Sequence, residues 1–365
     1  MEILLSLLVA ILPTIGYALL IWFMDRYEKE PWPLLAVTFV WGAVPAVILA
    51  LILEAIFGWS MSALSLTGTR LFTGTIVAPL VEESVKALAL VGLYLFLRSE
   101  FDDVLDGIIY GALVGMGFGM TENLVYFLRS FAQGGWDEWA ATVFVRSVIF
   151  GLNHAFYSSL FGASLGYARL ARMPKKRLGA PILGLAAAML AHAFHNTALA
   201  ACGGVLLAIF ADWSGILTIL VLAILALKRE ASWITTELAE EVSLGTLSSE
   251  DYATLSSLGG RLKAYRQKGR EGGWHKMREW RRLAQQATEL AFKKYQLRQR
   301  GEDAATLAAI TRLRTRIPAL RAELGQTASP PLVCQSCGHT LRPDSKFCTR
   351  CGKPVNAHTK EESPC

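Results

Sequence analysis

The stretch "APLVEESVKALAL" (residues 78–90) places three ionisable side chains inside a run of apolar residues. Glu82, Glu83 and Lys86 are flanked on both sides by leucine, valine or alanine. In a helix, Lys86 lies one turn from both glutamates, so its ammonium group can reach either carboxylate. Because ionisable groups in apolar helices face a protein interior or a water-filled cavity, the stretch predicts a helix with a charged face inside a bundle.

The composition predicts a membrane protein with a polar extension. The chain has 365 residues, of which 53% are hydrophobic and only 18% charged, whereas a soluble domain carries about 25% charged residues. Residues 1–227 contain 12 Lys/Arg and 15 Asp/Glu, and the remaining residues contain 24 and 15. We therefore expect a transmembrane, protease-like domain over residues 1–227, followed by a basic cytoplasmic region.

A membrane-spanning helix needs roughly 20 mostly apolar residues. A short turn near Gly203 and Gly204 separates the last two candidate segments, so six or eight spans also fit. The first segment has neither a basic start nor a cleavage pattern, which favours a span over a removed signal peptide. We expect an all-α polytopic membrane protein with about seven transmembrane helices, near residues 2–24, 34–57, 71–97, 104–129, 139–167, 178–200 and 204–227.

The distribution of basic residues between the loops predicts the orientation, because cytoplasmic loops are enriched in Lys and Arg. With seven spans, the first, third and fifth loops lie on the side of the C-terminal tail. These loops hold eight basic residues, and the opposite loops hold only Arg70 and Arg129. We expect a multi-pass protein of the cell membrane with its N-terminus outside and its tail in the cytoplasm.

Residues 228–325 have the pattern of a cytoplasmic helical region. Ser248 or Ser249 is a candidate N-cap, Gly301 is a candidate helix stop, and Pro318 is expected to kink or end the last helix. The basic surplus suits anionic lipid heads or nucleic acid, but no clear nucleic-acid signal is present. A solvated connector is the favoured interpretation.

Four cysteines near the C-terminus predict a structural metal site. Residues 326–331 have the composition of a linker, residues 332–356 of a zinc ribbon, and residues 357–365 of a disordered tail. Two C-x-x-C-G knuckles let four thiolates converge on one tetrahedral ion, zinc by preference and iron as the alternative. The predicted ligands are Cys334, Cys337, Cys348 and Cys351. A cytoplasmic protein partner is a further expectation for this small module.

Glu82 and Glu83 belong to a larger set of ionisable residues at membrane depth. The third predicted span holds Glu82 and Glu83, the fourth Glu122, the fifth His154 and the sixth His192. Each charged group in a span costs about 2.5–3.5 kcal/mol on insertion scales, so the set is too expensive for packing alone. Glycines crowd the fourth span before Glu122, which predicts close helix packing there. The glycines are Gly111, Gly115, Gly117 and Gly119.

These residues occur in motifs that resemble one protein family. The segments "DRYEKEPWPLL" (25–35), "EESVK" (82–86), "FGMTEN" (118–123), "NH" (153–154) and "HAFHN" (192–196) are similar to the PrsW family of bacterial intramembrane proteases, which is related to the CAAX-protease and Abi group. The resemblance covers roughly residues 10–227. It implies proteolysis of membrane-anchored anti-sigma factors, with the family's glutamates at positions 82, 83 and 122 and its histidines at positions 154 and 192. Asn196 stands where relatives have aspartate.

We therefore expect an intramembrane peptidase of the metallo- or glutamate type. Glu82 or Glu83 would activate water, Glu122 would assist proton transfer, and His154 with His192 would bind a metal or stabilise the oxyanion. A catalytic zinc would take Glu122 and the two histidines as ligands, although no H-E-x-x-H motif secures it. The alternatives are a transporter or proton relay, and a non-catalytic scaffold that recruits partners through its ribbon.

Overall fold

The computed structural model describes residues 1–27, 29–63, 69–98, 100–201, 203–301, 303–326, 333–339, 341 and 345–354. Most of the predicted linker and all of the predicted disordered tail lie outside these residues. The chain forms two compact units, residues 1–25 with 29–227 and residues 26–28 with 228–365. The described residues are helical apart from turns and one isolated β-bridge between Phe347 and Pro354. The all-α prediction is therefore confirmed.

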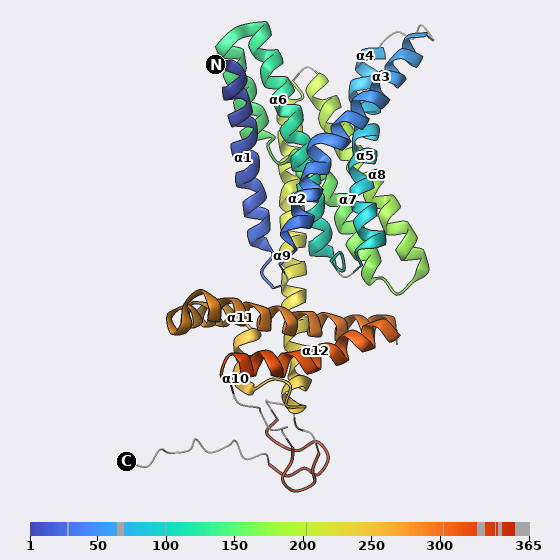
Figure 1. The fold of residues 1–365 in the computed structure, drawn as a ribbon. Coiled ribbons are helices and arrows are strands. Elements are labelled where there is room, and N and C mark those ends of the chain that lie inside the picture. The colour runs from blue at the N-terminus through green and yellow to red at the C-terminus, as the bar shows by residue number, and fades with distance from the viewer. Residues whose placement is uncertain are drawn as a thin grey trace. The chain divides into compact units, whose positions relative to one another are not determined.

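The first unit is a bundle of long helices (Figure 1). α6 packs against α1, α2 and α7, and α7 packs in turn against α8 and α5. α9 begins in this unit and runs on into the second. The elements are α1 (Glu2–Met24), α2 (Trp32–Trp41), η1 (Gly42–Ala46), α3 (Val47–Ala63), α4 (Thr69–Phe72), η2 (Thr73–Val77), α5 (Ala78–Phe96), α6 (Val104–Phe144), η3 (Val145–Ile149), α7 (Asn153–Leu170), α8 (Pro174–Ala200) and α9 (Val205–Ser243), where η marks a π-helical turn.

The predicted number of seven spans is not confirmed. Five stretches of the described chain are long and apolar enough to cross a membrane: Glu2–Met24, Trp32–Ser60, Val104–Leu170, Pro174–Ala200 and Val205–Ser243. Two physical features explain the difference. α5 carries three charged residues in the stretch 82–86. The predicted spans 104–129 and 139–167 fall within one stretch, Val104–Leu170, although its backbone leaves helical geometry at Gly135, where φ is 68°. The protein is a multi-pass membrane protein.

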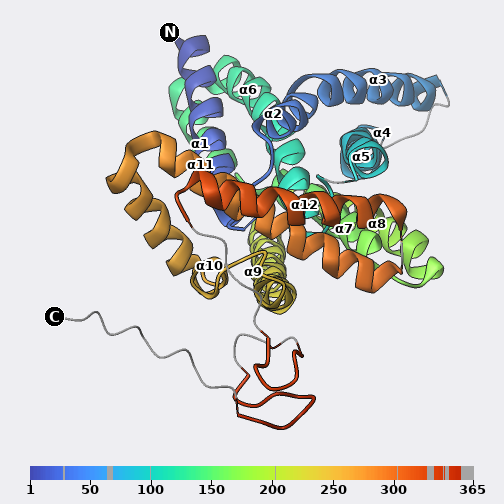
Figure 2. The same cartoon turned by 60° about the horizontal axis from the view of Figure 1, so that its bottom comes forward.

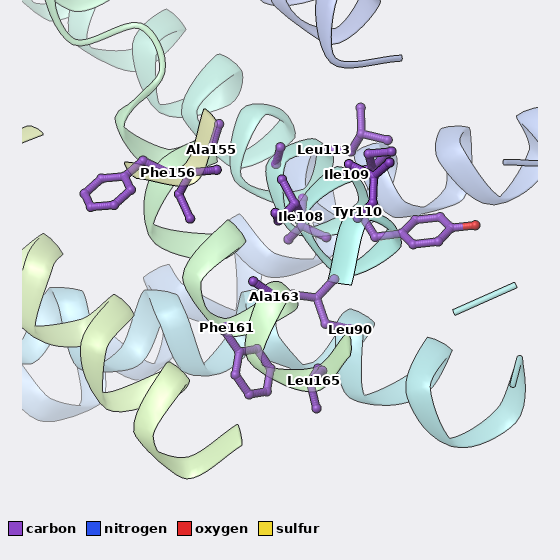
Figure 3. Packing of buried hydrophobic residues seen from close by; sticks show 14 of the residues in the cluster. Leu90, Ile108, Ile109, Tyr110, Leu113, Ala155, Phe156, Phe161, Ala163 and Leu165 are labelled. Carbon is purple, nitrogen blue, oxygen red and sulfur yellow. The ribbon is translucent and has the colours of Figure 1, made fainter. Parts of the chain in front are cut away.

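The first unit turns apolar side chains outward as well as inward. Leu4, Leu12 and Leu20 project from α1 with more than 60% of their surface exposed, as expected for a helix in contact with lipid. The buried apolar core is built mainly from α5, α6 and α7, with Leu90, Ile109 and Phe161 among its members (Figure 3). The buried polar side chains are therefore enclosed by helices that have apolar outer faces.

The glycines of α6 allow this helix to approach its neighbours at backbone distance. A Cβ atom on Gly107 would lie 2.0 Å from the carbonyl oxygen of Gly162, and one on Gly115 would lie 2.0 Å from that of His154. On another face of α6, a Cβ atom on Gly117 would lie 2.1 Å from the carbonyl oxygen of Phe39 in α2. The predicted close packing is confirmed, and it brings the start of α7 directly against α6.

The second unit contains α10 (Ser249–Leu255), α11 (Leu258–Arg300) and α12 (Ala304–Glu323). Ser248 caps α10 in a capping box with Asp251, and Gly301 ends α11 with φ at 88°, as predicted. The prediction that Pro318 kinks or ends the last helix is wrong in the second respect, because α12 continues to Glu323. The buried residues Ile317 and Leu320 flank the proline, and their packing holds this turn in the helix.

The helix contact at Gly107 predicts a stability effect. Gly107→Ala places a methyl group against the Gly162 carbonyl and should destabilise the protein by about 1–3 kcal/mol through overpacking. Gly92→Ala in α5 is the matched control, because nothing lies within 4 Å of its added Cβ. Thermal unfolding of the detergent-solubilised variants checks this, and equal midpoints for the two variants would contradict the packing described here.

Candidate active site

The centre of the polar cluster is the ammonium group of Lys86. Its Nζ atom lies 2.8 Å from Glu83 Oε1 and 3.3 Å from Glu82 Oε2. It also lies 3.9 Å from the ring centre of Phe118, which is one helical turn before Glu122. The Lys86 side chain is only 1% exposed. The sequence left open which carboxylate the lysine pairs with, and the structure pairs it with both.

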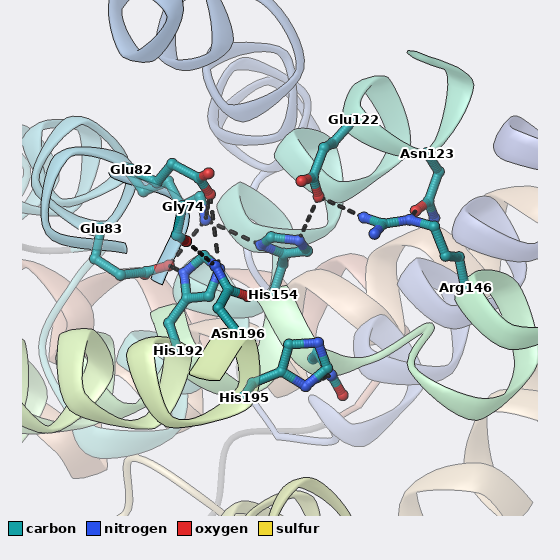
Figure 4. A network of polar contacts seen from close by, with 12 residues as sticks. Gly74, Glu82, Glu83, Glu122, Asn123, Arg146, His154, His192, His195 and Asn196 are labelled. Carbon is teal, nitrogen blue, oxygen red and sulfur yellow. Dashed lines mark hydrogen bonds and ion pairs between the residues drawn. The ribbon is translucent and has the colours of Figure 1, made fainter. Parts of the chain in front are cut away.

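His154, at the start of α7, contacts both Lys86 and Glu122, and Figure 4 shows its ring directed toward the Glu122 carboxylate. Lys86 Nζ lies 3.0 Å from His154 Nδ1, and His154 Nε2 lies 2.8 Å from Glu122 Oε2. An ammonium group can only donate and a carboxylate only accepts. We therefore assign the neutral tautomer in which Nδ1 accepts from Lys86 and Nε2–H donates to Glu122.

His192, from α8, also contacts the two glutamates, and its ring centre lies 5.2 Å from that of His154. Its Nδ1 atom lies 3.0 Å from Glu83 Oε1, and its Nε2 atom lies 3.9 Å from Glu82 Oε2. The shorter contact assigns the Nδ1 hydrogen to the bond with Glu83, which leaves Nε2 directed toward Glu82. Ser158 adds a hydrogen bond to Glu83 Oε2 at 3.3 Å. Glu83 is thus held by three side chains, whereas Glu82 has looser contacts.

Glu122 lies in an ion pair at the edge of the cluster. Arg146, from the π-helical turn η3, donates from Nη2 to Glu122 Oε2 at 2.6 Å and from Nε to Asn123 Oδ1 at 2.7 Å. Its guanidinium also lies 3.8 Å from the ring centre of Tyr126. These contacts hold Glu122 against His154, and the sequence assigned no partner to Arg146.

A second buried network adjoins the first. His195 Nδ1 lies 2.6 Å from Asp212 Oδ2, and Asn153 donates to the same oxygen at 2.9 Å. Tyr157 donates to Asp212 Oδ1 at 3.1 Å, and its ring stacks on His192 with the ring centres 4.7 Å apart. No role for Tyr157 was predicted from the sequence. The available signal was Asp212, an isolated acid in an apolar segment.

The two networks face one cavity of about 730 Å³. Glu82 lines it, while Glu83 is not among the described residues that do so. Glu54 of α3 also lines it, and the sequence analysis missed this residue although it is an acid in an apolar segment. The other polar residues that line the cavity include Glu122, Arg146, Asn153, His154, His192, His195 and Asn196. The predicted site residues are therefore brought together, and Glu83 alone among them is not one of the described residues that line the cavity.

Four of these residues could hold a metal ion. Glu82, Glu83, His154 and His192 each offer one donor atom, and these atoms lie within 4.8 Å of one another. This set differs from the predicted ligands Glu122, His154 and His192, because Glu122 is engaged by Arg146 on the far side of His154. The mixture of imidazole nitrogens and carboxylate oxygens suits zinc.

The second unit ends in a separate cysteine cluster. One sulfur atom from each of the four predicted cysteines lies within 4.8 Å of the others. Hydrogen bonding from the backbone N–H of Ser336 lowers the pKa of the Cys334 thiol to about 6, which favours the thiolate that binds zinc. Gly338 and Gly352, which follow the two knuckles, have φ near 70°. The chain thus has a structural zinc site of the ribbon type, as predicted.

Comparisons with known protein families match both the membrane unit and the cysteine cluster. A family described as "PrsW family intramembrane metalloprotease" matches residues 30–227, and a zinc-ribbon domain matches residues 333–355. No solved structure matches the chain.

Proteins named "Protease PrsW" are similar to this chain in three bacteria. The protein of Geobacillus kaustophilus is 29% identical over 43% of this chain and 64% of its own length, and that of Clostridioides difficile is 31% identical over 42% and 65%. The Bacillus subtilis protein is 30% identical over 51% of this chain and 79% of its own length. The match thus spans slightly less than two thirds of the first two relatives. The chain belongs to the PrsW family.

The ribbon predicts a defined zinc content. Replacing Cys334 and Cys348 together by serine should lower the zinc content by one ion per chain, because two of four thiolate ligands are lost. Thr349→Ala, an exposed change in the same module, is the matched control. Elemental analysis of the purified proteins checks this, and an unchanged zinc content in the double variant would contradict a ribbon site.

Proposed function

We propose that this member of the PrsW family is an intramembrane endopeptidase that hydrolyses peptide bonds of membrane-anchored regulatory proteins. The observation that carries the proposal is the meeting of Glu82, Glu83, His154 and His192 beside one cavity in the membrane unit. Ionisable side chains at membrane depth are energetically unfavourable, and a catalytic reaction that requires all four residues together explains why the chain places them there.

Glu82 is the general base, and Glu83 is a positioning residue. Glu82 lines the cavity, where a water molecule and a peptide can reach it. Glu83 is tied to Lys86 and His192 at 2.8 and 3.0 Å, so its oxygens are committed to holding these side chains. Glu82 takes a proton from water as the water oxygen attacks the scissile carbonyl carbon. It then returns this proton to the leaving nitrogen when the C–N bond breaks.

The surrounding side chains fix the orientation of the reacting groups. The Glu83 contact directs His192 Nε2 toward Glu82, where it accepts a hydrogen bond from the attacking water. Glu122, which Arg146 holds by a hydrogen bond, accepts from the Nε2–H of His154, and His154 Nδ1 accepts from Lys86. Glu122 therefore acts through His154 and does not transfer a proton itself.

The family description implies a metal, and the residues present fit one. Glu82, Glu83, His154 and His192 would hold it, and the Lys86 ammonium, which contacts three of these four residues, would give up its place. When bound, the ion would polarise the scissile carbonyl and activate water.

The substrate is a segment of a membrane-anchored protein in extended form. A helix with its side chains is about 10–12 Å wide and hides its peptide groups, so the segment must unwind to present a carbonyl to Glu82. An anti-sigma factor cut at its first site is the substrate class that the family resemblance implies. A cytoplasmic partner binds through the zinc ribbon.

Substitutions at the two glutamates separate their roles. Glu82→Gln should lower the cleavage rate by a factor of at least about 100, because it removes a general base, and it should lower thermal stability less than Glu83→Gln does, because its contact with Lys86 is longer, 3.3 against 2.8 Å. Glu83→Gln should lower both, since it leaves Lys86, a 1% exposed cation, with fewer partners. Loss of one partner of a buried pair costs about 3–5 kcal/mol. The assay follows cleavage of a panel of tagged single-span membrane proteins by the purified protein.

Glu138→Gln is the control, because Glu138 is an exposed carboxylate of α6 outside the cavity. Its activity should match that of the wild type. The proposal fails if the wild type cleaves none of the panel, or if Glu82→Gln cleaves as fast as Glu138→Gln. Substrate transport without cleavage would favour a transporter instead.

The proposed orientation has the N-terminus outside and the tail in the cytoplasm, supported by eight basic residues in one set of loops against two in the other. A periplasm- or exterior-active phosphatase fused after residue 326 should therefore be inactive, and a fluorescent protein at the same position should fluoresce. Active phosphatase at this position would reverse the assigned orientation.

A further inference from the structure

The first part of α11 is a strongly basic surface of the second unit that the function above does not use. Residues 258–271 contain five Lys/Arg and one acidic residue, Glu271. Lys268 and Gln267 already bind Glu271, each at 2.8 Å. The helix bends at Gly272 and Gly273, where φ is −155° and 60° (Figure 2). The segment before the bend contacts the long second part of α11 near its start, where Arg261 donates to Thr288 Oγ1 at 2.9 Å.

A hollow of about 400 Å³ lies on this segment. Lys263, Arg266 and Arg270 line it at helical spacing, and Gly259, which has no side chain, leaves room beside them. Within the described part of the chain, none of these three cations makes a hydrogen bond or an ion pair. Three uncompensated cations around one hollow make a site for an anionic group the size of a phosphate.

Exposed apolar side chains lie in the same stretch of the chain. Leu258 is 37% exposed, Leu262 is 51% exposed, and Trp274, just after the bend, is 69% exposed. Leu262 also lines the hollow. Cations beside exposed leucine and tryptophan are the pattern of a helix that lies in the interface of an anionic bilayer. A surface that binds nucleic acid has no need of the exposed leucines.

We propose that the hollow and its apolar border, residues 258–274, dock on the anionic phospholipid surface of the protein's own membrane. Lys263, Arg266 and Arg270 bind headgroup phosphates, while Leu262 and Trp274 enter the interfacial layer. The covalent connection supplies the bilayer at high local concentration, because α9 is one continuous helix from Val205 in the membrane unit to Ser243 in the second unit. The proposal is independent of the protease function.

Hydrogen exchange of the full-length protein in lipid nanodiscs tests the proposal. Backbone exchange of residues 258–274 should slow at least about fivefold when phosphatidylcholine discs receive phosphatidylglycerol, since each cation gains roughly this factor near an anionic surface. The effect should disappear at 1 M salt. Helix α12 serves as the internal reference, and its exchange should not change.

Two variants with the same loss of charge make the test specific. Lys263→Gln/Arg266→Gln/Arg270→Gln should abolish the slowing, whereas Arg281→Gln/Arg282→Gln/Arg312→Gln, which alters exposed cations outside the hollow, should retain it. Equal exchange in the two kinds of disc, or equal slowing in both variants, would overturn the proposal. Equal slowing by inorganic phosphate in phosphatidylcholine discs would overturn the membrane proposal, because it would show that the hollow binds free phosphate without a lipid surface. Protection by an RNA oligonucleotide that exceeds protection by the anionic lipid would overturn it in favour of nucleic acid.

Discussion

The organisation of the membrane unit depends on one buried cation. Lys86 is almost fully enclosed, and its ammonium group contacts two carboxylates, an imidazole and an aromatic ring. Removing an ammonium group from water costs several kcal/mol even after relaxation, so it must be matched by partners with good geometry. Those partners come from α5, α6 and α7, and through Glu83 the set extends to His192 in α8. The charge therefore fixes the relative register of four helices.

The glycines of α6 make this convergence sterically feasible. Only a helix without side chains at Gly107, Gly111 and Gly115 can bring its backbone against α7 at these distances. That contact sets His154 at the start of α7 between Lys86 and Glu122. The π-helical turn η3 then presents Arg146 to the other side of Glu122. Packing and electrostatics thus act on the same few residues, which is typical of functional sites in helical membrane proteins.

Much of this could be predicted from the sequence, because ionisable residues in apolar segments are conspicuous. The helical class, the site residues of α5 to α8, the glycine packing and the zinc ribbon all follow from local patterns. The number of spans does not follow from local patterns. Rules based on length and composition miscount a span that carries charges, such as α5, and a helix whose backbone is interrupted, such as α6. Which atoms meet also depends on tertiary contacts. Local spacing cannot show that Glu83 is enclosed while Glu82 faces the cavity, or that Tyr157 joins His192 to Asp212.

The central claim is that Glu82 delivers water to a peptide bond inside the membrane unit. Cleavage of a tagged single-span protein in H₂¹⁸O, followed by mass spectrometry of the fragments, tests this most directly. The account predicts ¹⁸O in the newly formed C-terminal carboxylate for the wild type, and no labelled fragment for Glu82→Gln. A labelled fragment formed equally by the Glu82→Gln variant, or no labelled fragment from the wild type, would contradict it.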